Sequence, residues 1–210
     1  MLSAIGACPR RQLKSEDYSV AVRDCDVRRA LHGTLLRDHA EAQDDTLFVD
    51  ELGLCGEVRV DVAVINGAMT GFEIKSERDT LRRLPKQVEF YSRVLDYAEI
   101  VVAKNHLAEA RRIVPSWWGV RVARLDADGG VQIKPVRRAR RNRHIDPLSL
   151  AQLLWREEAL AELAARGADR GVRSKPRSAV WERLVQTVDT HELQSMVRSR
   201  LKARTTWRVA

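Results

Sequence analysis

The clearest pattern of apolar and polar positions lies in the second quarter of the chain. Two β-like apolar runs, Val58 to Ile65 and Thr70 to Ser76, are joined by a turn at Asn66-Gly67. Both turn residues tolerate positive φ, so this pair between apolar runs predicts a β-hairpin. The hairpin is the reference point for the rest of the chain.

Helices and strands are expected to alternate around this hairpin. An apolar stripe at helical spacing predicts a helix from Asp26 to near Ala40. Pro85 is tolerated in the first turn of a helix, which sets the expected start of the next one. The predicted order is helix 26–40, strand 46–50, strands 58–65 and 70–76, helix 84–95, strand 98–103, helix 107–114, strand 117–123 and strand 131–135. This order is typical of an α/β domain around a mixed central sheet.

The domain organisation follows from where these patterns begin and end. We assign residues 1–23 to a loosely ordered lead-in and 24–136 to the α/β core. A dense basic run, 137–145, is interpreted as a linker. Asp146-Pro147 then caps a helix predicted to continue to about residue 167. With helices at 179–187 and from about Thr190, residues 146–210 are expected to form a helical module packed on the core.

Composition points to a polyanionic partner. The net charge is +8 and the isoelectric point is about 9.9, which favours DNA, although an arginine-rich genome would give the same balance. A solvated linker is the simpler interpretation of the basic run. The residues expected to contact phosphates are Arg137, Arg138, Arg140, Arg141, Arg143, Lys175 and Arg177.

Cysteine usage and hydropathy bear on the compartment. Three cysteines are widely spaced and form no C-x-x-C pair, which argues against a disulfide framework and a cysteine zinc site. No stretch approaches the roughly 18 apolar residues that a membrane span needs. We therefore expect a cytoplasmic protein without a membrane partner. A homo-oligomer, or a protein partner held by the C-terminal helices, stays open.

Charged residues interrupt the hairpin strands where apolar ones are expected. Asp61 lies within the first strand, and Glu73 and Lys75 share one face of the second. Ionised groups are rarely buried unless they are paired or bound to metal. Asp61 and Glu73 could hold Mg²⁺ or Mn²⁺, which prefer oxygen ligands, with Glu51 as a third acid. Lys75 could then orient the attacking water and neutralise a phosphate.

This site requires one particular hairpin phase. A strict two-residue turn would pair Asp61 with Ile74 and turn it away from Glu73 and Lys75. A three-residue loop, which pairs Asp61 with Lys75, or a bulge restores the phase. The hypothesis therefore requires Asp61 to share a face with Glu73 and Lys75.

The same residues carry a resemblance to a known family. Asp61 followed by Glu73-Ile74-Lys75 resembles the D-x(n)-(D/E)-x-K signature of the PD-(D/E)xK nuclease superfamily. Gln87 and Tyr91 are similar to the Q-x-x-x-Y element of its RecB-like branch. More narrowly, the chain resembles the bacterial sce7726 family, from the hairpin through WWGV and LLWREEAL to RGVRSKPR.

The resemblance implies a fold and an activity. The implied fold is a restriction-endonuclease-like αβββαβ core, and the implied activity is metal-dependent hydrolysis of DNA. It implies metal ligation by Asp61 and Glu73, with catalytic or positioning roles for Lys75, Gln87 and Tyr91. Two departures are noted: no proline precedes Asp61, and the third acid could be Glu41 or Glu51.

Two alternatives to a nuclease remain open at this stage. One is a catalytically silent nuclease fold that binds DNA or assembles with a partner in repair or phage-related processes. The other is a structural protein whose charged strand face carries a salt-bridged trio. Surface ion pairs of that kind are common and contribute little to stability.

Overall fold

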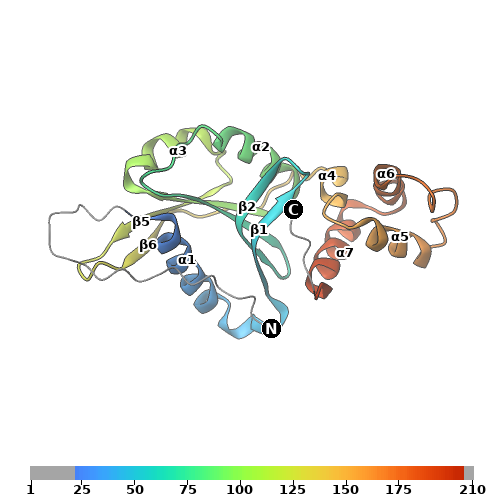
Figure 1. Ribbon diagram of the computed structural model, residues 1–210, viewed down its shortest axis with the longest axis horizontal. Helices are drawn as coiled ribbons and strands as arrows, with labels where there is room; N and C mark the ends of the chain where they lie inside the picture. The colour runs from blue at the N-terminus through green and yellow to red at the C-terminus, as the bar shows by residue number, and fades with distance from the viewer. Residues whose placement is uncertain (1–21, 206–210) are drawn as a thin grey trace.

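The computed structural model describes residues 22–205, so the predicted lead-in lies almost entirely outside the described residues. One six-stranded sheet forms the centre, and its strands lie side by side in chain order (Figure 1). The first three strands are antiparallel, the third to fifth are parallel, and the last is antiparallel again. The predicted α/β class with a mixed sheet is confirmed. The strands are β1 (Leu47–Leu54), β2 (Val58–Ile65), β3 (Met69–Lys75), β4 (Tyr97–Ala103), β5 (Gly119–Leu125) and β6 (Val131–Arg137).

Helices cover both faces of this sheet. On one face lies α1 (Asp24–Asp38), and on the other lie α2 (Leu84–Val94) and α3 (Leu107–Ile113), with the 3₁₀ turns η1 (Ala40–Asp45) and η2 (Lys104–His106) between elements (Figure 1). Buried Leu31 and Leu35 of α1 pack in one apolar cluster. Leu84 of α2 belongs to a second and larger cluster. The sheet is therefore the middle of three layers.

The hairpin between β2 and β3 has the expected turn. Its ladder begins with Ile65 opposite Met69, so three residues form the loop. The N–H of Asn66 donates to the carbonyl of Ala68 at 3.0 Å, and the N–H of Ala68 donates to Oδ1 of Asn66 at 3.1 Å. A three-residue loop is one of the two arrangements that the site hypothesis allowed.

Several predicted elements are wrong in their bounds. The strand expected at 46–50 is longer, because β1 continues to Leu54. The helix expected from 147 to about 167 is two helices, α4 (Pro147–Ala151) and α5 (Arg156–Ala165). The apolar stripe continues through the break, but the side chain of Glu158 accepts the N–H of Trp155 at 2.7 Å and starts a new helix there. The strand predicted from residue 117 begins only at Gly119, because the two preceding tryptophans lie in a turn.

The C-terminal helices α4 to α7 pack against the sheet's larger apolar cluster, which extends without interruption into them. The remaining two are α6 (Arg177–Thr187) and α7 (Thr190–Ala203). Buried Asp96, just before β4, ties them to the hairpin. It accepts hydrogen bonds from the N–H of Met69 at 2.8 Å and from the amide of Gln194 in α7 at 3.0 Å.

The segment between sheet and helices is held in place rather than loose. Asn142 is buried, and its side chain donates to the carbonyls of Ser92 at 2.7 Å and Leu95 at 3.0 Å. Its N–H donates to the carbonyl of Asp96 at 2.8 Å.

Within residues 22–205, none of the helices combines the length and the apolar character needed to cross a bilayer.

Candidate functional site

Three predicted acids lie at one level across the first three strands. In the register of β1 and β2, Glu51 falls opposite Asp61. In the register of β2 and β3, Asp61 falls opposite Glu73, one step beyond the last ladder pair. The partner is Glu73 and not Lys75 as predicted, but residues two apart on a strand share a face. The register therefore gives Asp61 the phase that the hypothesis requires.

Asp61 marks the point where β2 and β3 separate. The backbone ladder ends before it, and Oδ2 of Asp61 accepts the N–H of Ile74 at 2.7 Å in place of a backbone carbonyl. Burial raises the pKa of Asp61 to about 7, and the negative charge of Glu73 adds to the rise. The Ile74 N–H, Arg28 and Lys75 act in the opposite direction. Asp61 is therefore a carboxyl that titrates near neutral pH.

Glu73 is the centre of a buried polar network. It is 1% exposed, and Lys75 is 4% exposed. One carboxylate oxygen accepts from the Lys75 ammonium at 2.5 Å and from the Gln87 amide at 2.6 Å. The other accepts from the Tyr91 hydroxyl at 2.5 Å. Hydrogen bonds of this kind satisfy a buried carboxylate and fix its orientation.

The helix α2 presents Gln87 and Tyr91 to this carboxylate from one face, four residues apart as predicted. Burial, then the charge of Glu73, raises the pKa of Tyr91 well above its usual range, so its hydroxyl stays protonated and donates. The ring stacks on Trp118 with centroids 5.4 Å apart. The packing fixes the hydroxyl where Glu73 needs a donor.

Gln87 has an unusual feature. Its Nε2 donates to Glu73, but its Oε1 is buried and has no hydrogen-bond partner among residues 22–205. A buried acceptor left without a donor costs about 1–3 kcal/mol. Such orphaned atoms in native structures often mark a place where a water or ligand binds.

Glu51 takes a different position from the one expected of a metal ligand. Its backbone has φ of 56°, and its side chain is 43% exposed. The carboxylate pairs with Arg28 at 3.2 Å and with Arg59 at 3.2 Å. Glu41, the other candidate, lies in η1. In the part of the chain that the structure describes, no three Asp, Glu, His or Cys residues gather closely enough to hold a metal ion.

Comparison of the sequence with known proteins decides the family. The family model described as bacteriophage P4 protein cII matches residues 21–208. The chain belongs to this family. Protein cII of Enterobacteria phage P4 is 37% identical over 62 residues, which make up 30% of this chain and 24% of the phage protein. The aligned part is therefore about a quarter of that relative's length.

One solved structure is similar to this cII family chain. It is the SPO1766 protein of unknown function from Silicibacter pomeroyi, with a TM-score of 0.38 and 18% identity, covering 87% of this chain and 92% of that one. At this level of similarity it carries no argument about fold details or function.

The family assignment made from the hairpin motifs is wrong. The chain belongs to the cII family, and neither the sce7726 family nor the PD-(D/E)xK superfamily is supported. The reason is the small number of residues in the signature. An acid, then Glu-x-Lys and Q-x-x-x-Y fix few positions, whereas the cII family match extends over residues 21–208.

Arg28 is a residue of the candidate site that was not predicted from the sequence. It reaches from α1, and its guanidinium donates to the carbonyl of Asp61 at 2.6 Å and lies 3.4 Å from Oδ1 of the same residue. It also bridges to Glu51. The only signal in the sequence was an arginine on the polar side of a predicted helix, which many arginines share.

Some of the predicted nucleic-acid contacts are held by other residues of the chain, and most of them are exposed. Arg137 ends β6 and donates to the carbonyls of Trp118 at 2.8 Å and Pro115 at 2.9 Å, so it holds a turn in place. Arg141 lies 3.5 Å from buried Asp96. The exposed ones are Arg138, Arg140, Arg141, Arg143, Lys175 and Arg177, and they lie outside the network around Glu73.

Proposed function

We propose that this cII family chain is a divalent-metal-dependent nuclease that hydrolyses phosphodiester bonds in DNA. One observation carries the proposal. Asp61, with its pKa raised to about 7, lies across the hairpin from a buried Glu73 whose carboxylate is 2.5 Å from the Lys75 ammonium. Two acids and a lysine at the fork of two strands form a set suited to phosphate chemistry.

Two carboxylates of this site would hold Mg²⁺ or Mn²⁺, with waters as the remaining ligands. Asp61 and Glu73 supply the oxygen ligands that these ions prefer. Their mutual repulsion, which helps to raise the pKa of Asp61, is what a divalent cation between them would relieve. The orphaned Oε1 of Gln87 suits a hydrogen bond from a water near the ion. When bound, the ion would polarise the phosphate and lower the pKa of a bound water.

The chain's own residues would supply the rest. Lys75, held by Glu73, would balance negative charge on the phosphate. Gln87 and Tyr91 would hold the Glu73 carboxylate in its orientation. The proposal includes the finer fold statement that α1, β1 to β3, α2 and β4 correspond to a restriction-endonuclease-like core.

A second candidate function is binding of DNA, or assembly on it, without cleavage. Arg28 favours it, because its guanidinium lies between Glu51 and Asp61 and balances both carboxylates without a metal. The exposed basic residues of the chain would then contact phosphates.

The two candidates are separated by a cleavage assay on single-stranded, duplex and branched DNA with Mg²⁺, Mn²⁺ or EDTA. The nuclease requires cleavage that depends on metal and falls at least about a hundredfold in Lys75→Ala and Asp61→Asn. Asp128→Asn is the matched control, because Asp128 is exposed in the turn before β6. Cleavage that survives both site variants comes from another site or a contaminant. Binding with no product at any metal concentration favours the second candidate.

A further inference from the structure

The segments that follow β3 and β4 lie at the edge of the sheet where the candidate site ends. These two strands are parallel, and Lys75, the last residue of β3, lies opposite Val102 of β4. In open α/β sheets, ligands bind outside the carboxyl ends of the strands. The residues that directly follow Lys75 and Ala103 are therefore next to the proposed site of cleavage.

The backbone of Glu77 holds three segments together at this edge. Its N–H donates to the carbonyl of Val22, before α1, at 3.4 Å. Its carbonyl accepts from the side-chain amide of Asn105, in η2, at 3.2 Å. The carboxylate of Asp79 fixes the same loop, because it accepts the N–H of Ser76 at 2.7 Å and the Ser76 hydroxyl at 2.6 Å. The start of α1, the loop after β3 and η2 therefore form one surface.

This surface carries unpaired positive charge. Over residues 22–24, 76–83 and 104–106 there are five arginines and lysines and three acids, and one of the acids, Asp24, pairs with Arg28 at 3.6 Å. The basic residues are all exposed and, within residues 22–205, none of them forms an ion pair. These strand-end cations are Arg23, Arg78, Arg82, Arg83 and Lys104.

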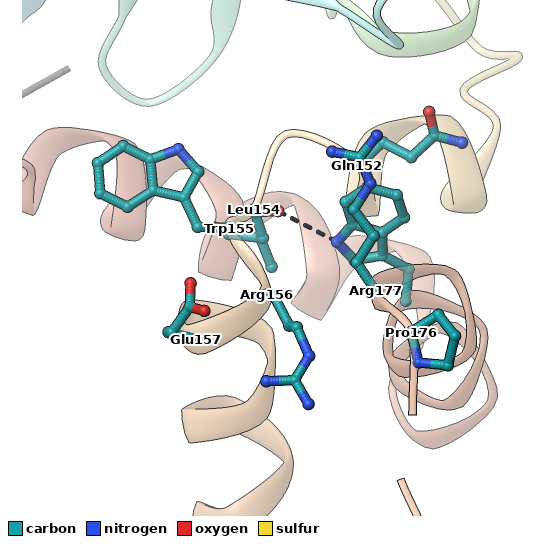
Figure 2. Close-up of a pocket in the computed structure, with 8 residues that line it drawn as sticks. Gln152, Leu154, Trp155, Arg156, Glu157, Pro176 and Arg177 are labelled. Carbon is teal, nitrogen blue, oxygen red and sulfur yellow. Dashed lines mark hydrogen bonds between the residues drawn. The ribbon is translucent and has the colours of Figure 1, made fainter. Parts of the chain in front are cut away.

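The arginines of the C-terminal helices are less available for a ligand. In the cavity that these helices line, Arg156 begins α5 and its guanidinium donates to two backbone carbonyls (Figure 2). Arg177 begins α6 and lies over the ring of Trp181, 5.3 Å from its centroid. The acid Glu157 lines the same cavity. The strand end therefore offers more free positive charge than this cavity.

We propose that the strand-end cations bind phosphates of a DNA strand beside the scissile bond. The inference rests on the proposed function, because this strand is the substrate that Asp61, Glu73 and Lys75 would cleave. Three residues of chain span at most about 11 Å, and successive phosphates of one strand are about 3.4 Å apart along the duplex axis. Arg78 therefore reaches a phosphate within a few nucleotides of the one at Lys75. Phosphate contacts position a strand and carry no sequence information, so this surface selects DNA without regard to sequence.

The test compares two double variants of the full chain. Arg78→Gln with Lys104→Gln removes two strand-end cations, and Arg170→Gln with Lys175→Gln removes the same charge from exposed positions among the C-terminal helices. All four side chains are exposed, so both variants should unfold at the same urea concentration as the wild type.

Binding to short fluorescent DNA, single-stranded and duplex, is measured by anisotropy in EDTA, so that no metal-dependent cleavage occurs. We expect the strand-end variant to bind about tenfold more weakly than the wild type at about 0.1 M salt. The slope of log affinity against log salt should become shallower by about 1.4 for the single strand or about 1.8 for the duplex, because two phosphate contacts are lost. The control variant should stay within about twofold of the wild type.

Cleavage in Mn²⁺ separates a failure of this inference from a failure of the proposed function. Where the wild type cleaves, the strand-end variant should raise KM about tenfold and leave kcat within about threefold, because its side chains do not touch the reacting atoms. Unchanged binding by the strand-end variant, or an equal loss in the control variant, overturns the inference and leaves the nuclease standing. Loss of binding in the strand-end variant alone, with no cleavage by the wild type, overturns the nuclease and supports DNA binding by these cations.

Discussion

The carboxylate of Asp61 stands in for a missing strand partner: its Oδ2 accepts the backbone N–H of Ile74 at 2.7 Å, where the ladder between β2 and β3 has ended. The two strands can part here without leaving a buried donor unsatisfied. The same bond holds an acid beside Glu73 in surroundings that raise its pKa. The same carboxyl group therefore satisfies a backbone donor and lies where its charged form is disfavoured.

Asp61→Asn should make stability less dependent on pH. The pKa of Asp61 is raised from 3.8 to about 7 in the folded chain. The contribution of Asp61 to the free energy of unfolding of the wild type is therefore complete below about pH 4. It is lost as the pH rises through about 7. Asparagine does not titrate and can still accept the Ile74 N–H. In urea unfolding, the free energy of unfolding of the variant relative to that of the wild type should rise by on the order of 2–4 kcal/mol between pH 4 and pH 8.

Asp128→Asn is the control for this measurement, because Asp128 is exposed in the turn before β6. Its difference from wild type should stay constant over the same range. If Asp61→Asn also gave a constant difference, Asp61 would not titrate near neutral pH and its role at the fork would need another explanation.

Tyr91→Phe should destabilise the fold by about 1–3 kcal/mol, because it removes a donor 2.5 Å from a buried carboxylate oxygen. The ring stays in its stack on Trp118, so the change isolates the hydroxyl. Chemical unfolding at neutral pH measures the effect. Tyr97→Phe is the matched control, since Tyr97 is partly exposed at the start of β4. A loss no larger than that of the control would mean that Glu73 does not depend on Tyr91.

The sequence predicted an element correctly where residues within that element determine its structure. The strand from Val58 to Ile65 has the predicted bounds, and α2 begins next to Pro85 as expected. The helix break before Trp155 was missed because hydrogen bonds mark it: Glu158 accepts the N–H of Trp155, and Trp181, 27 residues after Leu154, donates to the Leu154 carbonyl. No periodicity within residues 147–167 contains that information.

Some residues of the candidate site were predicted from the sequence, and others were not. Helix spacing predicted that Gln87 and Tyr91 share a face, and only the family resemblance linked them to the site; in the structure both donate to Glu73. Arg28 contacts Asp61 across 33 residues of sequence, and its position depends on how α1 packs on the sheet. The family could not be read from the motif either, since a few spaced residues constrain ancestry far less than the match over residues 21–208.

Asp96→Ala should loosen the C-terminal helices from the sheet. Asp96 is buried and accepts from Met69 in the hairpin and from Gln194 in α7, so its removal leaves two buried donors unpaired. We expect a loss of about 2–5 kcal/mol. Hydrogen exchange should speed up in α7 and at the start of β3 before it does in β4 and β5. Asp189→Ala, which removes the N-cap of α7, should cost only about 1 kcal/mol. Equal effects of the two variants would contradict an anchoring role.

Gly71→Ala tests how closely the hairpin packs on the segment before β4. A Cβ at Gly71 would meet the side chain of buried Leu95 and would lie 3.0 Å from Cγ1 of Val60. Both neighbours belong to the larger apolar cluster, so neither can move without displacing others. The expected loss in unfolding free energy is about 1–3 kcal/mol.

Gly53→Ala is the matched control for this substitution. Gly53 lies in β1, and an added Cβ there meets nothing within 4 Å. Alanine restricts the unfolded chain more than glycine, so this variant should be neutral or slightly stabilising. The sign of the difference between the two variants is therefore set by packing alone. If Gly71→Ala were as stable as Gly53→Ala, Leu95 would have room to move, and the fork at Asp61 and Glu73 would rest on a looser layer than the buried cluster implies.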